Sequence, residues 1–423
     1  MANFPSLQVW AVSSPAMAYV YYGVMRLPKG HLRLAASLPL IAFYVFVAKG
    51  FDTVFERSIY SFFFIWLTSF KIVLLCWDDG PASDPWAIAS FPRFLAVMNL
   101  SLQIKREKFS QRLKGHRIKS KSRDSNSAAI PSDVALNGNE SKLTEPQKPT
   151  KSSWRSLLKS VDGSLDWHMV VLRLLFKFVV VLLITCSYAY RSSMPLGLLY
   201  VIYSFHIYIV ASLIFEGIAA IVSPMMGIEL EAAFDKPFLA HSLSDFWGKR
   251  WNLLVSNLMR VSIYDPMLRF LLWNQSEHHS RTEPSNGEQS RNGPPSTIST
   301  SIISKPPLWA RSIAMMAAFL TSGLMHELIF HNMTRQKPTW QVTVFFTLHG
   351  AATLLELAIR RKVAFRPSKW ISTPLTLGFT LLTAVWYFYP PLVDSGTAEA
   401  VIDEFTCFFQ KLHQSVVGLV GGS

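Results

Sequence analysis

A histidine near the end of a long apolar segment is the first residue here whose chemistry stands out. His326 lies within the apolar residues 308–330, with Ser322 and Gly323 about one helical turn earlier on the same face. An ionisable side chain inside a membrane segment is costly and commonly marks a functional site. A neutral imidazole in a dry cavity can accept a proton from an alcohol, so His326 is a candidate general base. The alternative is a histidine that only bonds neighbouring helices.

The small residues Ser322 and Gly323 leave space beside His326. We expect that space to admit a substrate chain or the close approach of another helix. The next residue after the histidine, Glu327, points about 100° away around a helix, so we interpret it as a partner for a neighbouring helix.

A second stretch, residues 235–252, reads DKPFLAHSLSDFWGKRWN. Its S-L-S-D sequence resembles a capping box, which predicts a helix start. On that helix Asp245 and Lys249 are four residues apart and are expected to pair, and Trp247 and Trp251 share a face in the same way. Tryptophans beside basic residues at a helix end are also typical of a membrane-interface belt.

The last residue of that stretch is an amide at the point where the chain turns apolar again. Asn252 needs a hydrogen-bonding partner there, and a carboxamide can bind a carbonyl oxygen or orient a histidine. We interpret four other polar residues inside apolar segments as structural. His349 and Glu356 share a face of one helix and are expected to pair, and the other two are His206 and Glu216.

The composition indicates a membrane protein. Half of the residues are hydrophobic and only 16% are charged, and the apolar residues come in blocks of about twenty, enough to cross a bilayer as a helix. We predict an all-α, polytopic membrane protein with about eight transmembrane helices around a central reaction chamber. The expected spans are residues 7–25, 32–49, 59–77, 168–190, 196–222, 308–330, 340–359 and 370–389.

The charge of +14 is concentrated in one polar segment. Residues 105–159 hold 14 Lys or Arg against five Asp or Glu, as expected of a cytoplasmic loop, and no nucleic-acid motif accompanies them. Residues 26–33 and 360–369 are also basic, and alternation of the spans puts all three connections, together with residues 235–251, on the cytoplasmic side. The amino terminus and the tail are then expected on the opposite side. The first span is expected to remain in place as an anchor.

Two polar segments divide the chain. Residues 105–162 are too poor in large apolar side chains to offset the entropy of ordering, and residues 274–306 form a second polar loop. The apolar parts are residues 1–104, 163–273 and 307–391, followed by a tail of residues 392–423. Three scattered cysteines give neither a disulfide framework nor a zinc spacing.

The D-F-W-G-K-R-W-N sequence that ends at Asn252, together with S-G-L-M-H-E from Ser322 to Glu327, resembles the wax synthase branch of the membrane-bound O-acyltransferases. The closer similarity is to plant long-chain-alcohol O-fatty-acyltransferases and sterol acyltransferases. It extends to F-T-L-H-G at residues 346–350 and W-D-D-G-P at residues 77–81.

The resemblance implies an endoplasmic reticulum enzyme that moves a fatty acyl group from acyl-CoA, a co-substrate, to a hydroxyl. It assigns catalytic roles to His326 as base and to Asn252, which would hold the acyl carbonyl. We expect a long-chain alcohol as acceptor, with a sterol as the alternative. No cofactor or metal is expected, and neither is a nucleic-acid partner.

The substrate-binding residues expected from this mechanism lie mostly in the first stretch: Asp245, Trp247, Lys249, Arg250, Trp251 and Ser322. The CoA phosphates would lie near Lys249 and Arg250, and the alcohol would enter from the lipid. Two other classes of protein compete with this interpretation. One is a transporter with a polar path along His326, His349 and Glu356, and the other is a membrane scaffold. No internal repeat of the kind common in transporters is visible.

Overall fold

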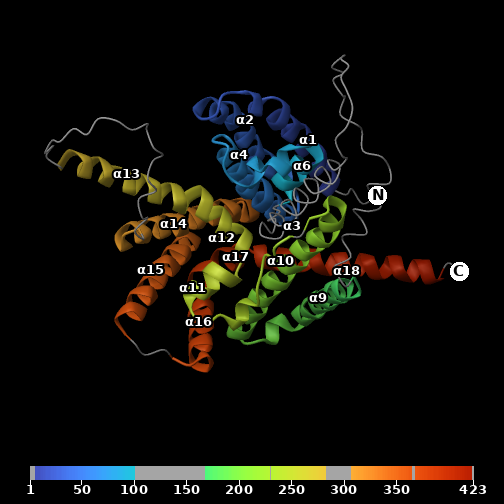
Figure 1. Ribbon diagram of the computed structural model, residues 1–423. Coiled ribbons are helices and arrows are strands. Elements are labelled where there is room, and N and C mark those ends of the chain that lie inside the picture. Colours follow the sequence, from blue (N-terminus) through green and yellow to red (C-terminus); the bar gives the residue numbers. More distant parts are fainter. Residues whose placement is uncertain (1–4, 101–166, 229, 283–305, 364–366, 422–423) are drawn as a thin grey trace, which may run out of the picture.

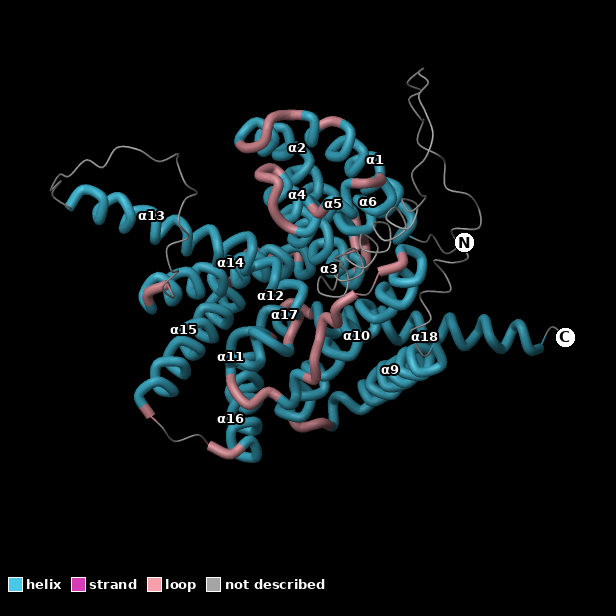
Figure 2. The backbone as a smooth tube through the Cα atoms, in the orientation of Figure 1, coloured by secondary structure: helices cyan, strands magenta, loops and turns pink. Residues whose placement is uncertain are grey.

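The computed structural model describes residues 5–100, 167–228, 230–282, 306–363 and 367–421. Every regular element in these ranges is a helix, so the predicted all-α fold is confirmed (Figure 2). The basic segment 105–162, with the glycosylation sequon at Asn139, and most of the polar segment 274–306 lie outside the described residues.

Seven helical stretches are long and apolar enough to cross a bilayer. They are His31–Gly50, Val54–Leu75, Trp167–Ser193, Leu196–Met226, Leu308–Thr334, Gln341–Lys362 and Lys369–Asp394. The first predicted span, residues 7–25, is helical as α1 (Pro5–Tyr22) but is not among these seven. The chain is a multi-pass membrane protein.

The amino-terminal helices gather into one group, drawn in blue in Figure 1. Its elements are α1 (Pro5–Tyr22), η1 (Val24–Arg26), α2 (His31–Val47), η2 (Ala48–Gly50), α3 (Val54–Tyr60), η3 (Ser61–Thr68), α4 (Ser69–Leu75), η4 (Pro81–Ser83), α5 (Pro85–Ile88) and α6 (Phe91–Asn99). Three large side chains at its centre, Trp66, Phe94 and Met98, are fully buried, so this group supplies a rigid wall for the rest of the chain.

The middle of the chain begins with two adjacent long helices, drawn in green in Figure 1. The elements are α9 (Trp167–Ser187), η5 (Tyr188–Ser193), α10 (Leu196–Met226), η6 (Pro237–Leu239), α11 (Leu243–Asp245), η7 (Phe246–Arg250), α12 (Leu253–Met259), η8 (Arg260–Tyr264) and α13 (Asp265–Thr282). Lys177 of α9 bonds to Glu216 and Ser212 of α10, which confirms the structural interpretation of Glu216. The helix α13 runs past residue 274, where we expected a loop to begin.

The carboxy-terminal helices, orange and red in Figure 1, pack α14 closely against α15. The elements are α14 (Leu308–Thr334), α15 (Gln341–Lys362), α16 (Lys369–Thr383), η9 (Ala384–Phe388), α17 (Pro390–Asp394) and α18 (Thr397–Gly421). A Cβ at Gly323 would lie 3.0 Å from Thr343 Cα, and one at Gly350 would lie 2.9 Å from Phe319 Cβ. The two glycines therefore permit the close approach that we predicted beside His326.

Contacts between the ends of the spans divide the connections into two groups, as alternating spans require. In the first group Arg33 pairs with Asp78. Glu356, near the end of α15, accepts a hydrogen bond from the amide of Leu243 at 2.6 Å. The connections around residues 26–33, 76–81 and 235–252 therefore lie, with the last turns of α15, at one end of the helices.

The second group lies at the other end. Arg335, just after α14, donates to the carbonyl of Phe51 at 2.8 Å, between the first two of the seven spans. Glu404 of α18 accepts the amide of Val54 at 2.6 Å. The tail helix therefore begins on the side opposite to residues 235–252, in agreement with the predicted alternation; the assignment of the cytoplasmic side stays a prediction.

Candidate active site

His326 projects from α14 with one ring nitrogen held and the other open. Nδ1 lies 2.8 Å from the carbonyl oxygen of Ser322. Because a carbonyl oxygen can only accept a hydrogen bond, Nδ1 carries the hydrogen and the lone pair of the neutral ring is on Nε2. The ring stacks on Phe346 at 4.1 Å between centroids and meets the edge of Trp66 at 4.8 Å. The tautomer and the orientation that a general base needs are therefore both fixed.

Asn252 is presented by an unusual backbone conformation. It ends the motif with φ 41° and ψ 64°, a left-handed region that asparagine tolerates better than most residues. Its Oδ1 accepts the amide of Val255 at 3.3 Å and caps α12. Within the described part of the chain its Nδ2 has no hydrogen-bond partner, so two N–H donors remain available.

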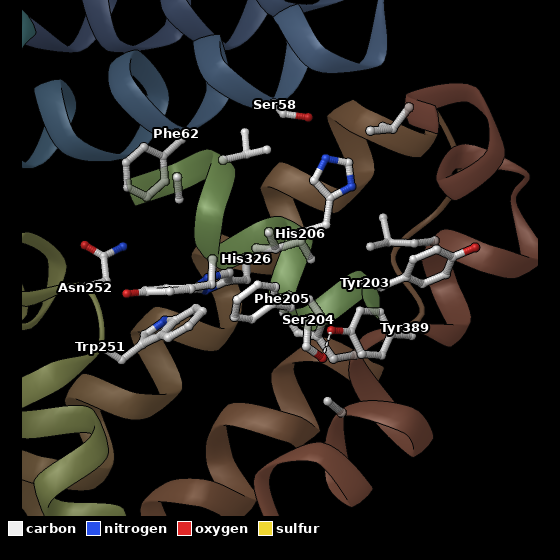
Figure 3. Close-up of a pocket in the computed structure, with 18 of the residues that line it drawn as sticks. Ser58, Phe62, Tyr203, Ser204, Phe205, His206, Trp251, Asn252, His326 and Tyr389 are labelled. Atoms are coloured by element: carbon white, nitrogen blue, oxygen red, sulfur yellow. Dashed lines mark hydrogen bonds between the residues drawn. The ribbon is translucent and has the colours of Figure 1, made fainter. Parts of the chain in front are cut away.

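One cavity of about 610 Å³ is lined by both His326 and Asn252. That volume lies in the range of small-molecule sites. Figure 3 shows the two residues reaching the same pocket, His326 from α14 and Asn252 from the turn before α12. The walls are mainly aromatic and aliphatic, so the cavity suits long hydrocarbon chains.

The cavity extends between the two groups of connections. Phe234, just before residues 235–252, and Pro237, within them, line one part of the cavity. Phe55 and Thr397, from the opposite end of the helices, line another. A molecule can therefore occupy the cavity along much of the length of the helical bundle.

Three of the four π-helical segments in the described chain supply walls of this cavity. Phe62 comes from η3, Trp247 from η7 and Phe388 from η9. A π-turn inserts a residue and rotates the side chains that follow it, and such segments are frequent at functional sites. The sequence analysis did not predict them, because hydropathy does not distinguish a π-turn from an α-turn.

Trp247 is held in the wall by a buried histidine. Its Nε1–H donates to Nδ1 of His349 at 3.0 Å, and Nε2 of that ring lies 2.8 Å from Oγ1 of Thr383. The predicted pair of His349 with Glu356 is therefore wrong. Glu356 instead accepts from the amide of Leu243 and caps α11, so both residues keep a structural role.

The predicted pair of Asp245 with Lys249 is also wrong. Arg250, five residues on, lies with its Nε 2.6 Å from Oδ2 of the carboxylate, and Nδ1 of His241 lies 2.9 Å away. The π-turn η7 explains the difference, since it bonds the amide of Trp251 to the carbonyl of Phe246 and puts residue i+5 over residue i. The predicted capping box is confirmed, with Ser242 Oγ accepting the amide of Asp245 at 3.0 Å.

Electrostatics keep Asp245 ionised. Burial acts to raise its pKa, but the hydrogen bond from Arg250, the backbone amide of His241 and the charges of both neighbours together lower it from the ordinary value. The carboxylate thus fastens the start of the motif to its end. Lys249 is exposed and, among the described residues, has no charged partner.

The predicted site residues therefore separate into two sets. His326, Asn252, Trp247 and Trp251 line the cavity. Those outside its wall are Asp245, Lys249, Arg250 and Ser322. No group of three or more His, Cys, Asp or Glu side chains suited to a metal ion occurs in the part of the chain that the structure describes.

Two further interpretations from the sequence can be compared with the structure. Glu327 accepts the amides of Trp340 at 2.7 Å and Thr343 at 3.2 Å, so it caps α15 and the predicted role as a partner for another helix is confirmed. His206, which received a structural interpretation, lines the cavity. Sequence reasoning missed the ring of Phe346 against His326, although that residue begins the F-T-L-H-G segment already singled out.

Two segments of the chain match a known protein family. Residues 230–285 and 288–348 match the model of the membrane bound O-acyl transferase family. These residues contain both Asn252 and His326. Over these two segments the chain is similar to the membrane-bound O-acyltransferases.

Proteins named as acyltransferases match almost the whole length of the chain. It is 29% identical to acyl-CoA–sterol O-acyltransferase 1 of Arabidopsis thaliana, over 96% of this chain and 94% of the relative. It is 28% identical to the long-chain-alcohol O-fatty-acyltransferase of Simmondsia chinensis, over 98% and 97%. A probable long-chain-alcohol O-fatty-acyltransferase 1 of Arabidopsis thaliana is 29% identical, over 94% of each chain. The protein is an acyltransferase, and the transporter and scaffold alternatives are set aside.

Proposed function

We propose that this enzyme transfers a fatty acyl group from acyl-CoA to a long-chain alcohol and forms a wax ester in the endoplasmic reticulum membrane. The observation that carries the proposal is that Nε2 of His326 and Nδ2 of Asn252 both face one apolar cavity without a partner among the described residues. A hydrogen-bond acceptor and a donor are thus available where a hydroxyl and a thioester carbonyl could meet. The relatives named long-chain-alcohol O-fatty-acyltransferase support this choice of acceptor.

The chemistry needs one base and one donor. Nε2 of His326 takes the proton of the alcohol while its oxygen attacks the thioester carbon, and the Nδ1–H bond to Ser322 supports the imidazolium that forms. Nδ2 of Asn252 donates to the carbonyl oxygen as negative charge develops. When the C–S bond breaks, the imidazolium returns the proton to the thiolate, which leaves as CoA thiol.

The basic residues of the motif divide their tasks in this mechanism. Lys249 is exposed at the end of the helices where residues 235–252 lie, so it can meet the phosphates of CoA. The guanidinium of Arg250 already binds Asp245 and the carbonyl of Asp235, which makes it a structural fastener of the motif. We therefore assign phosphate binding to Lys249 and revise the expectation for Arg250.

The proposal is tested with microsomes from a host that lacks neutral-lipid acyltransferases, supplied with labelled acyl-CoA and a long-chain alcohol. The wild-type chain should form wax ester, and His326→Ala should lower the rate at least about a hundredfold. His331→Ala is a matched control, because His331 lies on the same helix outside the cavity wall. Ester formed at full rate by His326→Ala would overturn the assignment of the base.

A sterol is the second candidate acceptor. The similarity to acyl-CoA–sterol O-acyltransferase 1 favours it, and so do the aromatic rings near Asn252, where Phe234 and Trp251 line the cavity edge to face, 5.3 Å apart between centroids. Such faces can pack on a ring system. Sterols added to the same assay decide between the two, since the preferred acceptor has the larger kcat/KM.

A further inference from the structure

A second imidazole faces the cavity, and the mechanism above does not use it. His206 of α10 lines the cavity and is 6% exposed. Its Nδ1 lies 3.0 Å from the hydroxyl of Tyr188. Its Nε2 is buried and has no hydrogen-bond partner among the described residues. Figure 3 draws this ring on the pocket wall, in the part of the pocket where Ser58 is labelled.

The two imidazoles lie at separate places along the cavity. His206 contacts Phe405 at 5.0 Å between centroids, and Phe405 contacts Phe55 at 5.5 Å. His326 instead contacts Trp66 at 4.8 Å. Phe55 and Trp66 belong to one continuous helical stretch, and eleven residues of helix correspond to about 16 Å. His206 therefore contacts a different part of the cavity wall from His326, on the side of Phe405 and Phe55.

Other polar side chains near His206 are already satisfied or point elsewhere. Ser204 donates to the carbonyl of Tyr200 at 2.9 Å, so the hydroxyl of Tyr389 must be the donor in its bond to Ser204. In Figure 3 the hydroxyl of Tyr203 points away from His206. Among the described residues that line the cavity, Nε2 of His206 is thus the buried side-chain atom that still lacks a hydrogen-bond partner.

A saturated hydrocarbon chain cannot supply that partner. A buried polar atom without a hydrogen bond is unfavourable, so the cavity is better matched to a ligand that brings an oxygen to this place. The bond to Tyr188 fixes the imidazole ring, and Nε2 can then donate or accept according to the direction of that bond. A neutral hydroxyl, which can do both, is the complementary group.

We propose that His206, oriented by Tyr188, forms a second polar subsite that binds a hydroxyl at the far end of the acceptor chain. The preferred acceptors are then long-chain alcohols with a second, terminal hydroxyl. This inference rests on the proposed function, because it takes the reacting hydroxyl to lie at His326. The acyl-CoA head group is assigned to the opposite end, near Lys249, which leaves this end to the acceptor.

The test compares saturated monoalcohols with α,ω-diols of the same chain length in microsomes that contain the full chain. The wild type should prefer the diol about tenfold in kcat/KM, the size expected of one buried hydrogen bond. Because the distance between the two histidines is fixed, the preference should peak at one chain length. A diol preference of no more than about two at every length, which is the statistical factor for two equivalent hydroxyls, would overturn the subsite.

Three variants locate the effect. His206→Leu, which keeps the approximate size of the side chain, should abolish the diol preference, measured as the ratio of the diol and monoalcohol kcat/KM values of the same variant. Tyr188→Phe removes the hydroxyl that orients the ring and should reduce the preference partly. Tyr203→Phe is the matched control for Tyr188→Phe. Tyr203 lies on the same helix as His206, and this variant should keep the diol preference. A preference that survives both His206→Leu and Tyr188→Phe would contradict the proposal.

The outcomes separate this inference from the proposed function. If the wild type forms no ester from either alcohol, the proposed function fails. If it esterifies both equally, the function stands and the subsite fails. Should His206→Leu not accumulate in the membrane, the chain-length series and Tyr188→Phe still decide.

Discussion

The indole N–H of Trp247 donates to Nδ1 of His349 at 3.0 Å and connects the π-turn η7 to the centre of α15. His349 is fully buried, and its second nitrogen bonds to Oγ1 of Thr383 in α16. One imidazole thus joins three elements and holds in the cavity wall an aromatic ring that the substrate chain would touch.

Replacement of His349 should cost both stability and activity. His349→Leu leaves the Trp247 N–H and the Thr383 oxygen without their partner, which costs about 1–3 kcal/mol of unfolding free energy. Thermal unfolding in detergent measures the loss, and ester formation should also fall because Trp247 is no longer held. The double variant Trp247→Phe/His349→Leu should lose less than the sum of the single variants; strictly additive losses would mean that the bond is not energetically coupled.

The contact between α14 and α15 predicts a specific effect of one methyl group. In Gly323→Ala the new Cβ would lie 3.0 Å from Thr343 Cα and 3.2 Å from its carbonyl oxygen, and backbone atoms cannot rotate away. We expect a loss of about 1–3 kcal/mol, seen as a lower melting temperature. The control is Gly217→Ala in α10, which meets nothing within 4 Å and should be neutral or stabilising. Equal melting temperatures for the two variants would refute the close packing.

The carboxylate of Asp245 should give the motif a pH-dependent stability. Its pKa is lower in the folded chain than its ordinary value of 3.8, so its contribution is fully present above about 3.8 and is lost as the pH falls through the folded pKa. The melting temperature of Asp245→Asn should therefore lie below that of the wild type at pH 7. The difference should shrink only as the pH falls below about 3.8. A difference that grows on acidification would mean that folding raises the pKa of Asp245 instead of lowering it.

The fold class was predictable because hydropathy and length determine which segments enter lipid. Seven of the eight expected spans are helices of sufficient length, and the grouping of their connections follows from alternation alone. The exception, α1, is helical but does not meet the same criteria. His326 and Asn252 were also identifiable, since each is a polar residue in an apolar setting and the pair occurs in a family pattern.

Cross-helix partners were not predictable from spacing along one helix. The predicted pair of Asp245 with Lys249 assumed the i,i+4 spacing of an α-helix. The π-turn η7 makes Arg250, at i+5, the partner of Asp245. His349 binds Trp247, about a hundred residues away, in preference to Glu356 on its own helix. Such choices depend on tertiary packing, which local periodicity does not contain.

The division of roles between Lys249 and Arg250 is open to a direct test. Lys249 is exposed, so Lys249→Ala should raise the KM for acyl-CoA several-fold and leave the free energy of unfolding within about 0.5 kcal/mol of the wild type. Arg250 bonds to Asp245 at 2.6 Å, so Arg250→Ala should lower the melting temperature clearly. An unchanged KM in Lys249→Ala would remove it from the phosphate site.

Asn252 combines a helix cap, a left-handed backbone and the proposed catalytic donor, and two substitutions separate these tasks. Asn252→Asp keeps an oxygen that can cap Val255 but replaces both N–H donors with an acceptor. We expect normal abundance and a fall in kcat of about 10²–10³, as for loss of an oxyanion donor. The KM for acyl-CoA should change little, because the donor acts mainly as charge develops.

Asn252→Gly tests the backbone instead. Glycine accepts φ 41° without strain, so this variant loses the cap and the donor but keeps the turn. Its melting temperature should fall modestly, by the value of one cap, and its kcat should fall as far as that of Asn252→Asp. If Asn252→Asp retains full kcat while Asn252→Gly loses stability, the residue serves only to cap α12, and His326 would have to act without a carboxamide donor from this position.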